Sequence, residues 1–140
     1  MIRPGTEGDR AFILDSWLRG LWALGSYPLP HDRFFAAFRP TVTELLEHPD
    51  VLVLVDAPEV DTSRIRSYLV FSPGPEAAIH WCHTRPASRR QGAAKALLSA
   101  AGLGPRTPYT LHSRVAHRVT RGPFLPLTVR NLLRTPRTPQ

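Results

Sequence analysis

Apolar residues near the start of the chain recur at the spacing of a helix. Residues 2–4 are expected to form a short strand. Thr6 follows as an N-cap, with two acidic residues in the next turn, where the helix dipole favours negative charge. From there to residue 24, apolar side chains return every three or four positions, which predicts an amphipathic helix. Its apolar face consists of Ile13, Trp17, Leu21 and Leu24.

Glycine and proline residues at 25–30 end this pattern, and two shorter helical stretches follow. Residues 31–38 are expected to form a short helix that Asp32 caps. Pro40 is expected to separate it from the next helix, because proline lacks the N–H group that an interior helical position needs. That next helix is expected over residues 41–48, which begin with capping-box spacing.

From residue 51 the apolar pattern is that of strands. Residues 51–57 form a valine-rich run of strand length, which predicts a buried strand. Residues 64–72 and 77–84 are two further strand candidates, and proline-containing segments separate the three. Three consecutive strands joined by turns predict an antiparallel meander.

One more helix and strand complete the pattern. The stretch "RRQGAAKALLSAA", residues 89–101, predicts a helix that Gly102 ends from the C′ position. A last strand is expected over residues 109–115, then a helical segment at 127–133 and a flexible tail at 135–140. This order predicts an α/β fold of the α+β type, a mostly antiparallel sheet flanked by helices, in a single domain over residues 1–134.

Composition excludes several classes of protein. The 140 residues, 42% hydrophobic and 21% charged, suit one globular domain. No apolar run is long enough to cross a bilayer and no signal core begins the chain, so we expect no membrane and a cytoplasmic location. Cys82 is the only cysteine, so no internal disulfide is possible. No histidine pair stands near it at zinc-ligand spacing, and no metal is expected.

Charge divides the chain into two unequal halves. Residues 1–76 hold 7 basic and 11 acidic residues, a net charge of −4, whereas residues 77–140 hold 11 basic residues and no acid, a net charge of +11. These sum to the overall +7. Codon bias explains the preference for arginine over lysine, but it does not explain missing acids. The second half is therefore expected to meet an anionic partner: a phosphate-bearing cofactor, a nucleic acid or an acidic protein face.

The start of the helix at 89–101 suits an anion. A helix N-terminus presents backbone N–H groups without partners, and together with the helix dipole these attract phosphate. Gly92, Ala93 and Ala94 keep this first turn free of large side chains, while Arg89 and Arg90 add positive charge in front of it. Residue chemistry alone thus predicts a phosphate-binding turn here.

The same residues resemble a motif of the GCN5-related N-acetyltransferases, the GNAT family. Arg89, Gly92 and Ala94 match its Q/R-x-x-G-x-G/A pattern. The preceding "CHTRPASRR" resembles the family's strand and turn before that loop, with Thr84 and Pro86 in the usual valine and proline positions. The element order over the first four-fifths of the chain is also similar. Short phage-encoded members look most alike, and the family's last two strands are expected to be missing, so that the fold is C-terminally truncated.

The resemblance implies acetyl-CoA as the donor and an amine as the acceptor. It implies that the pyrophosphate sits on the N–H groups of the turn, and that the pantetheine arm pairs with the backbone of the preceding strand. The implied pyrophosphate residues are Arg89, Arg90, Gln91, Gly92, Ala93, Ala94 and Lys95, and the implied pantetheine residues are Cys82, His83 and Thr84.

The groups that move protons are less well determined. The family's usual acid, a tyrosine after the fifth strand, has no counterpart, since no tyrosine follows Tyr109. We expect His80 and His112 as catalytic residues, with Glu76 and His83 as further candidate bases. Each also has a structural interpretation: Glu76 as a solvated turn residue, and the strand histidines as packing residues. Strand alternation predicts that His80 and His83 face opposite ways. Cys82 is expected to be a buried structural thiol.

Two kinds of function stay open. One is an N-acetyltransferase whose acceptor site includes the loop at residues 25–32 and aromatic residues of the first two helices, although core packing also accounts for those aromatics. The other is an inactive GNAT-fold module that binds protein or DNA through its basic half, for example as a component of a phage virion. An exposed sheet edge could pair with a protein partner or with a second copy of the chain.

Overall fold

The computed structural model describes residues 1–25, 28–111, 120 and 122–124. The expected helix at 127–133 and tail at 135–140 lie outside these residues, as do His112 and most of the expected last strand. The elements in chain order are β1 (Ile2–Pro4), the 3-10 turn η1 (Glu7–Asp9), α1 (Arg10–Ala23), α2 (His31–Glu47), β2 (Leu52–Asp56), β3 (Ser67–Ser72), β4 (Ala78–Thr84), the 3-10 turn η2 (Pro86–Ser88) and α3 (Ala93–Ala100).

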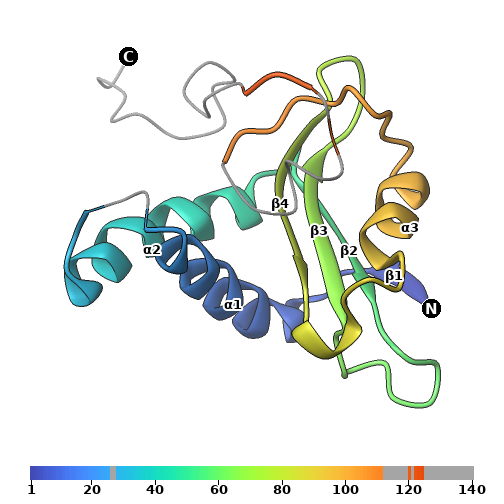
Figure 1. Ribbon diagram of the computed structural model, residues 1–140, viewed down its shortest axis with the longest axis horizontal. Helices are drawn as coiled ribbons and strands as arrows, with labels where there is room; N and C mark the ends of the chain where they lie inside the picture. Colours follow the sequence, from blue (N-terminus) through green and yellow to red (C-terminus); the bar gives the residue numbers. More distant parts are fainter. Residues whose placement is uncertain (26–27, 112–119, 121, 125–140) are drawn as a thin grey trace.

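The four strands form one sheet in the order β1-β2-β3-β4, and each pairs antiparallel with its neighbour (Figure 1). The expected meander is therefore confirmed. A short turn joins β3 to β4, whereas a longer segment, residues 57–66, joins β2 to β3. β1 adds a fourth strand at the edge of the sheet, where it pairs with β2. The N-terminal amine holds this edge by hydrogen bonding the carbonyl of Ala57 at 2.8 Å.

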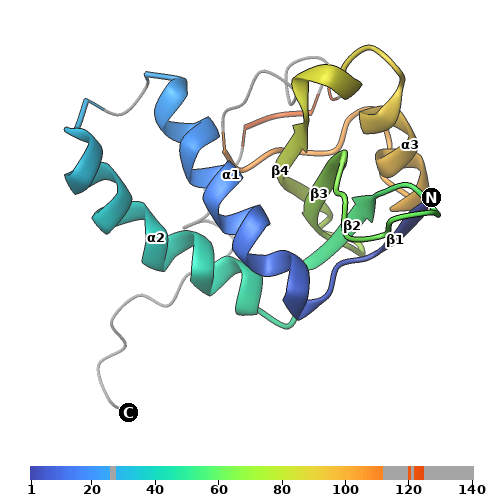
Figure 2. The same ribbon diagram turned by 90° about the horizontal axis from the view of Figure 1, so that it is seen from below.

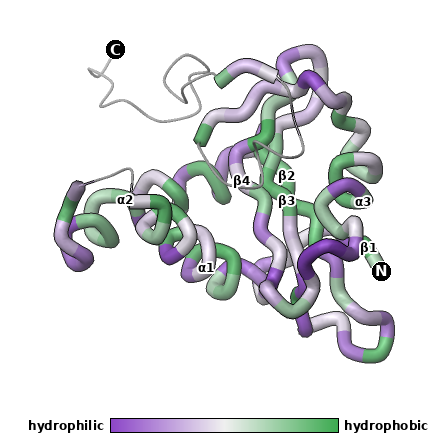
Figure 3. Tube along the Cα trace, viewed as in Figure 1, coloured by the Kyte–Doolittle hydropathy of each residue, from purple (hydrophilic) through white to green (hydrophobic). Residues whose placement is uncertain are grey.

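Helices cover both faces of the sheet. Figure 2 shows α1 and α2 on one side and α3 on the other. β3 is buried along its whole length because its alternate side chains enter two separate cores. Tyr68 and Val70 join the core under α1 and α2, whereas Leu69 and Phe71 join the core under α3. The tube in Figure 3 shows hydrophobic stretches within β2 and β3, whereas the colour along β4 is mixed.

The first two helices differ in part from expectation. Thr6 does cap the chain's first turn, in a capping box with Asp9, but this turn is the 3-10 turn η1 and α1 starts after it. The prediction of two helices separated by Pro40 is wrong. α2 continues through Pro40, and Pro30 rather than Asp32 occupies its N-cap. Buried side chains on both sides of the proline pack against the same core, which holds the helix together across it: Phe34, Val42 and Leu45.

Strand β2 is less buried than its apolar sequence predicts. Leu52 is 47% exposed, and Val55 is the only residue within the strand that is fully buried. The reason is its neighbour: β1 is only three residues long, so β2 lies close to the edge of the sheet. β3 also begins three residues later than expected, at Ser67.

Helix α3 begins at Ala93, four residues later than predicted. The turn η2 and an irregular segment at residues 89–92 precede it, because Arg90 and Gly92 both have left-handed backbone conformations that a helix does not allow. The predicted end is confirmed. Gly102 has φ +71°, its N–H donates to the Ser99 carbonyl, and the N–H of Leu103 donates to the Leu98 carbonyl.

A β-bulge interrupts β4 at His80. Val70 pairs with Trp81, but the next residue of β3, Phe71, pairs with Ile79, so His80 is extra. After α3 the chain returns to this point, where Tyr109 forms a parallel bridge with Ile79. Tyr109 also forms a parallel bridge with Phe124, and in the described residues these two bridges are the only strand pairing of the expected last strand.

Candidate functional site

The segment between β4 and α3 holds an unusual backbone. Arg90 has φ +65°, and no other non-glycine residue of the described chain has a positive φ. Gly92 follows with φ +75° as the N-cap of α3. Such left-handed residues turn successive N–H groups toward one side, and a non-glycine residue held in this conformation is strained. A strained turn that opens a helix is a feature of anion-binding loops.

No described acceptor occupies the N–H groups of this turn. The first backbone hydrogen bond of the helix runs from Ala96 to the carbonyl of Gly92, at 3.0 Å. The N–H groups of residues 91–95 therefore have no acceptor within the described chain. A Cβ built on Gly92 would meet no atom within 4 Å, so no side chain fills the space in front of the helix. The turn is vacant, as a phosphate site requires.

Three cations lie in or next to the vacant turn. Arg89, Arg90 and Lys95 are exposed, and none of them forms an ion pair with any described carboxylate. Figure 3 accordingly shows strongly hydrophilic chain where it leads into α3. No acidic residue follows Glu76 in the sequence, so β4 and the chain after it bring no carboxylate to this site. The local field favours anions.

The outer edge of β4 presents backbone groups next to this turn. The N–H of Arg85 donates to the carbonyl of Arg66 at 2.8 Å, so this pair is hydrogen-bonded. Bonded pairs alternate along an antiparallel ladder. Cys82 and Thr84 therefore turn their backbone groups away from β3, whereas the backbone of His83 turns toward it. Arg89 Nε lies 3.4 Å from the outward carbonyl of Thr84.

Cys82 has the character of a packing residue. Its side chain is 2% exposed and lies in the core under α3. Burial raises the pKa of the thiol to about 12, so the thiolate is absent near neutral pH. Its burial and its protonated state both favour a packing role over a nucleophilic one, and leave its backbone as the part that can meet a ligand.

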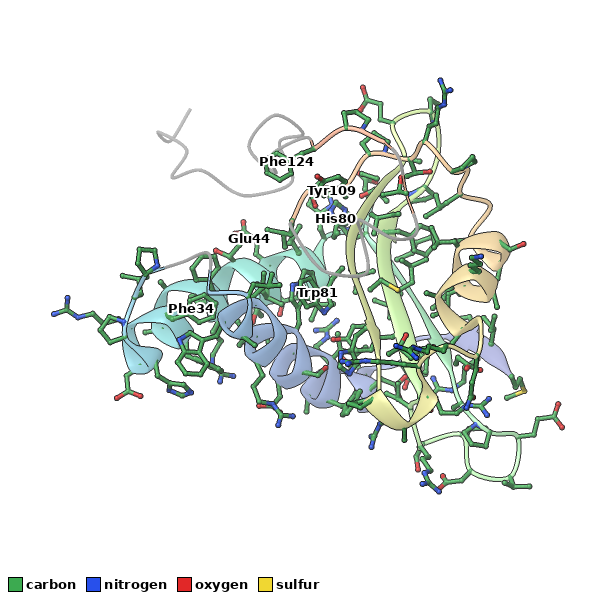
Figure 4. The ribbon with its side chains drawn as sticks, viewed as in Figure 1. Phe34, Glu44, His80, Trp81, Tyr109 and Phe124 are labelled. Carbon is green, nitrogen blue, oxygen red and sulfur yellow. The ribbon has the colours of Figure 1, made fainter. Side chains whose placement is uncertain are left out.

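His80 is held between two hydroxyl groups. Its ring is 1% exposed, Nε2 lies 2.7 Å from Ser72 Oγ, and Nδ1 lies 2.7 Å from Thr110 Oγ1. Figure 4 shows it beside Tyr109, at the end of β4 away from the turn. The network links β3, β4 and the segment after α3, so it holds the chain where Tyr109 meets the bulge. Both ring nitrogens are thus engaged in hydrogen bonds within the fold.

His83 lies on the same side of the sheet as His80, not on the opposite side as predicted. Its ring packs 5.4 Å from Tyr68 and 6.2 Å from Phe12, on the α1 face. The bulge explains the difference, because His80 is itself the extra residue and the alternation shifts by one position at it. The imidazole is partly exposed, and its nitrogens make no hydrogen bond in the described chain. Burial, then the charges of Arg89, Arg85 and Arg19, lower its pKa to about 4.

The other predicted candidates divide into exposed residues and buried core residues. Glu76 is exposed in the turn between β3 and β4, away from the vacant turn. Trp17 and Phe34 are fully buried core residues, as their packing interpretation predicts. Trp22 is 43% exposed and contacts His31 edge to face, with ring centroids 5.0 Å apart. The loop between α1 and α2 is described only in part.

Sequence reasoning missed two sets of residues. Ser72 and Thr110 could be found only from the tertiary structure, since both act through His80. The second set is Arg85 and Phe12. Arg85 gave a weak signal, because it lies inside the matched motif. Nothing in the sequence pattern, however, predicted that its guanidinium carbon lies 4.8 Å from the centre of the Phe12 ring. In the described residues, no group of three His, Cys, Asp or Glu side chains is arranged to hold a metal ion. Nor is any described helix long and apolar enough to cross a membrane.

Known structures share this architecture. A proposed acetyl transferase from Pyrococcus furiosus matches with a TM-score of 0.62 and 16% identity, over 73% of this chain and 71% of that one. A proposed GNAT-family acetyltransferase from Staphylococcus aureus matches with 0.54 and 16% identity, over 71% and 85%. The chain has a GNAT-like fold. A ribosomal-protein-alanine N-acetyltransferase from Brucella melitensis shares the GNAT-like fold as well, with 0.52 and 14% identity over 90% and 79%.

Sequence comparison adds no closer relative. No family model matches the chain, and no curated protein matches it. At 14–16% identity the likeness concerns the GNAT-like fold, so the chemistry has to be derived from this chain's own residues.

Proposed function

We propose that this protein is an N-acetyltransferase that takes its acetyl group from acetyl-CoA. The vacant N–H turn at residues 91–95 carries the proposal, because it lies on a GNAT-like fold with three cations, Arg89, Arg90 and Lys95, in or next to it. These residues fit the pyrophosphate of coenzyme A, which needs N–H donors, positive charge and room for a close approach. The outward backbone groups of Cys82 and Thr84 would receive the pantetheine arm.

The reaction needs the protein to orient two substrates and to move one proton. The amine nitrogen attacks the thioester carbonyl carbon, the C–S bond breaks, and the leaving thiolate takes up a proton. An outward N–H of β4 would stabilise the oxyanion that forms on the carbonyl oxygen. We assign acceptance of the amine proton to His83, because its ring is partly exposed and its nitrogens make no hydrogen bond in the described chain. Its lowered pKa makes it a weak base, so it would take the proton only from the strongly acidic ammonium that forms when the amine attacks. His80, bonded on both sides, has the role of holding the segment at Tyr109. His112 stays a candidate outside the described residues.

Calorimetry with acetyl-CoA tests the proposal. Gly92→Glu places a carboxylate in the vacant turn, and we expect it to weaken binding at least about a hundredfold, equal to about 2.7 kcal/mol. Gly102→Glu is the matched control: it lies at the other end of α3, has nearly the same φ (+71° against +75°), and also has open space around it. Similar loss of binding in both variants, or no binding by the unmodified protein, would contradict the proposal.

The alternative is a GNAT-fold module that binds protein or DNA, for example in a phage particle, without catalysis. The observation in its favour is the excess of positive charge after residue 76, which is larger than coenzyme A needs. A protein that ignores acetyl-CoA but binds duplex DNA with a steep salt dependence would support this alternative.

A further inference from the structure

The α1 face of β4 carries a compact group of aromatic and cationic side chains. The His83 ring lies between Phe12 of α1 and Tyr68 of β3. The guanidinium carbon of Arg85 stands 4.8 Å from the centre of the Phe12 ring, and the charges of Arg89 and Arg19 also act on the imidazole. We call His83, Arg85 and Arg89 the arginine–histidine group. Its members come from β4 and the segment that follows.

Both arginines of this group are positioned by one nitrogen and keep the others available. Arg85 Nε donates to the carbonyl of Ile65 at 2.5 Å, and Arg89 Nε makes the longer contact to Thr84. Their terminal nitrogens have no partner in the described chain. A guanidinium held in this way presents two parallel N–H groups, which match the two oxygens of a carboxylate or phosphate.

No carboxylate competes for these nitrogens. Asp15 is the only acid of α1, and it already pairs with Arg19 at 2.6 Å. No acid follows Glu76, so the remaining chain cannot bring one, wherever it lies. A second ammonium group on an acceptor would find no counter-charge here, whereas an oxyanion would find two cations.

We propose that the arginine–histidine group selects an acceptor amine that also carries an oxyanion, a carboxylate or a phosphate, a few bonds from its nitrogen. This inference rests on the proposed function and adds the substrate class. Arg85 and Arg89 bind the oxyanion, which leaves the amine beside His83 and the outer edge of β4. The two sites share Arg89, but Arg85 belongs to the acceptor side alone, since it stands over Phe12 of α1. The vacant turn opens α3, which lies on the other side of the sheet (Figures 1 and 2).

Four primary amines of similar size test the selection: β-alanine, O-phosphoethanolamine, ethanolamine and putrescine. With acetyl-CoA and detection of the free thiol, we expect the two anionic amines to have the highest kcat/KM and putrescine the lowest. The ratio between β-alanine and O-phosphoethanolamine then shows which oxyanion is preferred. Arg85→Ala should lower kcat/KM for the anionic amines at least about tenfold, leave ethanolamine unchanged, and leave acetyl-CoA affinity unchanged. Arg39→Ala removes an exposed arginine of α2 and should change nothing.

A binding measurement separates this inference from the proposed function. In the protein with bound coenzyme A, N-acetyl-β-alanine should shift the NMR signal of the His83 ring, and N-acetylethanolamine should not. If coenzyme A binds but neither ligand moves His83, or if Arg85→Ala affects all four amines equally, the selection is wrong and the coenzyme site stands. If coenzyme A does not bind at all, both proposals fail.

Discussion

Several single residues have roles that differ from those their side-chain chemistry alone suggests. His80, His83 and Cys82 are all reactive types within four positions of one strand, yet their surroundings separate them. Two hydroxyls hold His80, burial keeps Cys82 protonated, and burial with nearby arginines keeps His83 neutral. The residue types were visible in the sequence. Their roles were not, because pKa values and accessibility depend on what packs around each side chain.

The depressed pKa of His83 predicts a loss of stability in mild acid. The unfolded chain takes up a proton near pH 6.5, and the folded protein only near pH 4, so lowering the pH between these values favours unfolding. Because the ring is partly exposed, we expect the loss to be about 1–2 kcal/mol. Urea unfolding of the wild type and of His83→Gln at pH 7 and pH 4.5 measures it.

The glutamine variant should lose less stability over this interval. The titration of Asp9 does not contribute to the change in unfolding free energy between pH 7 and pH 4.5. Hydrogen bonding to Arg3 lowers its pKa to about 2, so its contribution is lost only below pH 3.8. An equal loss in wild type and variant would show that His83 is not the group that titrates.

At the scale of elements, hydrophobic periodicity predicted nearly every helix and strand of residues 1–101. It failed where local chemistry and tertiary packing disagree. Pro40 should end a helix by its local chemistry, but α2 continues because its buried face spans the proline. The reverse holds at residues 89–92, where good helix formers stay outside α3 because the backbone turns left-handed. Periodicity also gave no sign of the bulge in β4.

Pro40 therefore lowers the stability of α2 locally, although the helix continues through it. The residue is exposed, so its removal leaves no cavity. We expect Pro40→Ala to raise the free energy of unfolding by about 2 kcal/mol, since alanine restores an N–H donor and relieves the ring, less a small gain of freedom in the unfolded chain. Urea denaturation measures the change. A less stable variant would mean that the proline shapes the packing of α2 on α1.

At the scale of the whole molecule, charge is segregated in sequence and in space. The chain after Glu76 contains every cation of the proposed coenzyme site and no acid. Segregation of this kind attracts anions over a distance, and salt screens it. The sequence was sufficient to predict an anionic partner. The fold adds that three of these cations, Arg89, Arg90 and Lys95, lie in or next to one vacant turn.

Acetyl-CoA binding should consequently weaken with salt. We expect the Kd to rise about tenfold between 50 and 500 mM NaCl, because several cations face the phosphates. Calorimetry at four salt concentrations measures the slope, and dephospho-CoA, which has fewer charges, should give a shallower one. Equal slopes for the two ligands would place the extra phosphate away from the cationic residues.

The sequence by itself determined the order of helices and strands, the location of the turn that opens α3, and the positive charge around it. These depend on neighbouring residues: apolar spacing, glycine and small side chains, and a local excess of arginine. Only the tertiary structure decided which strand groups face outward, which side of the sheet each histidine occupies, and which arginines keep their terminal nitrogens available. Those properties arise where β3, β4, α1 and the chain after α3 meet, and one extra residue at the bulge is enough to change them.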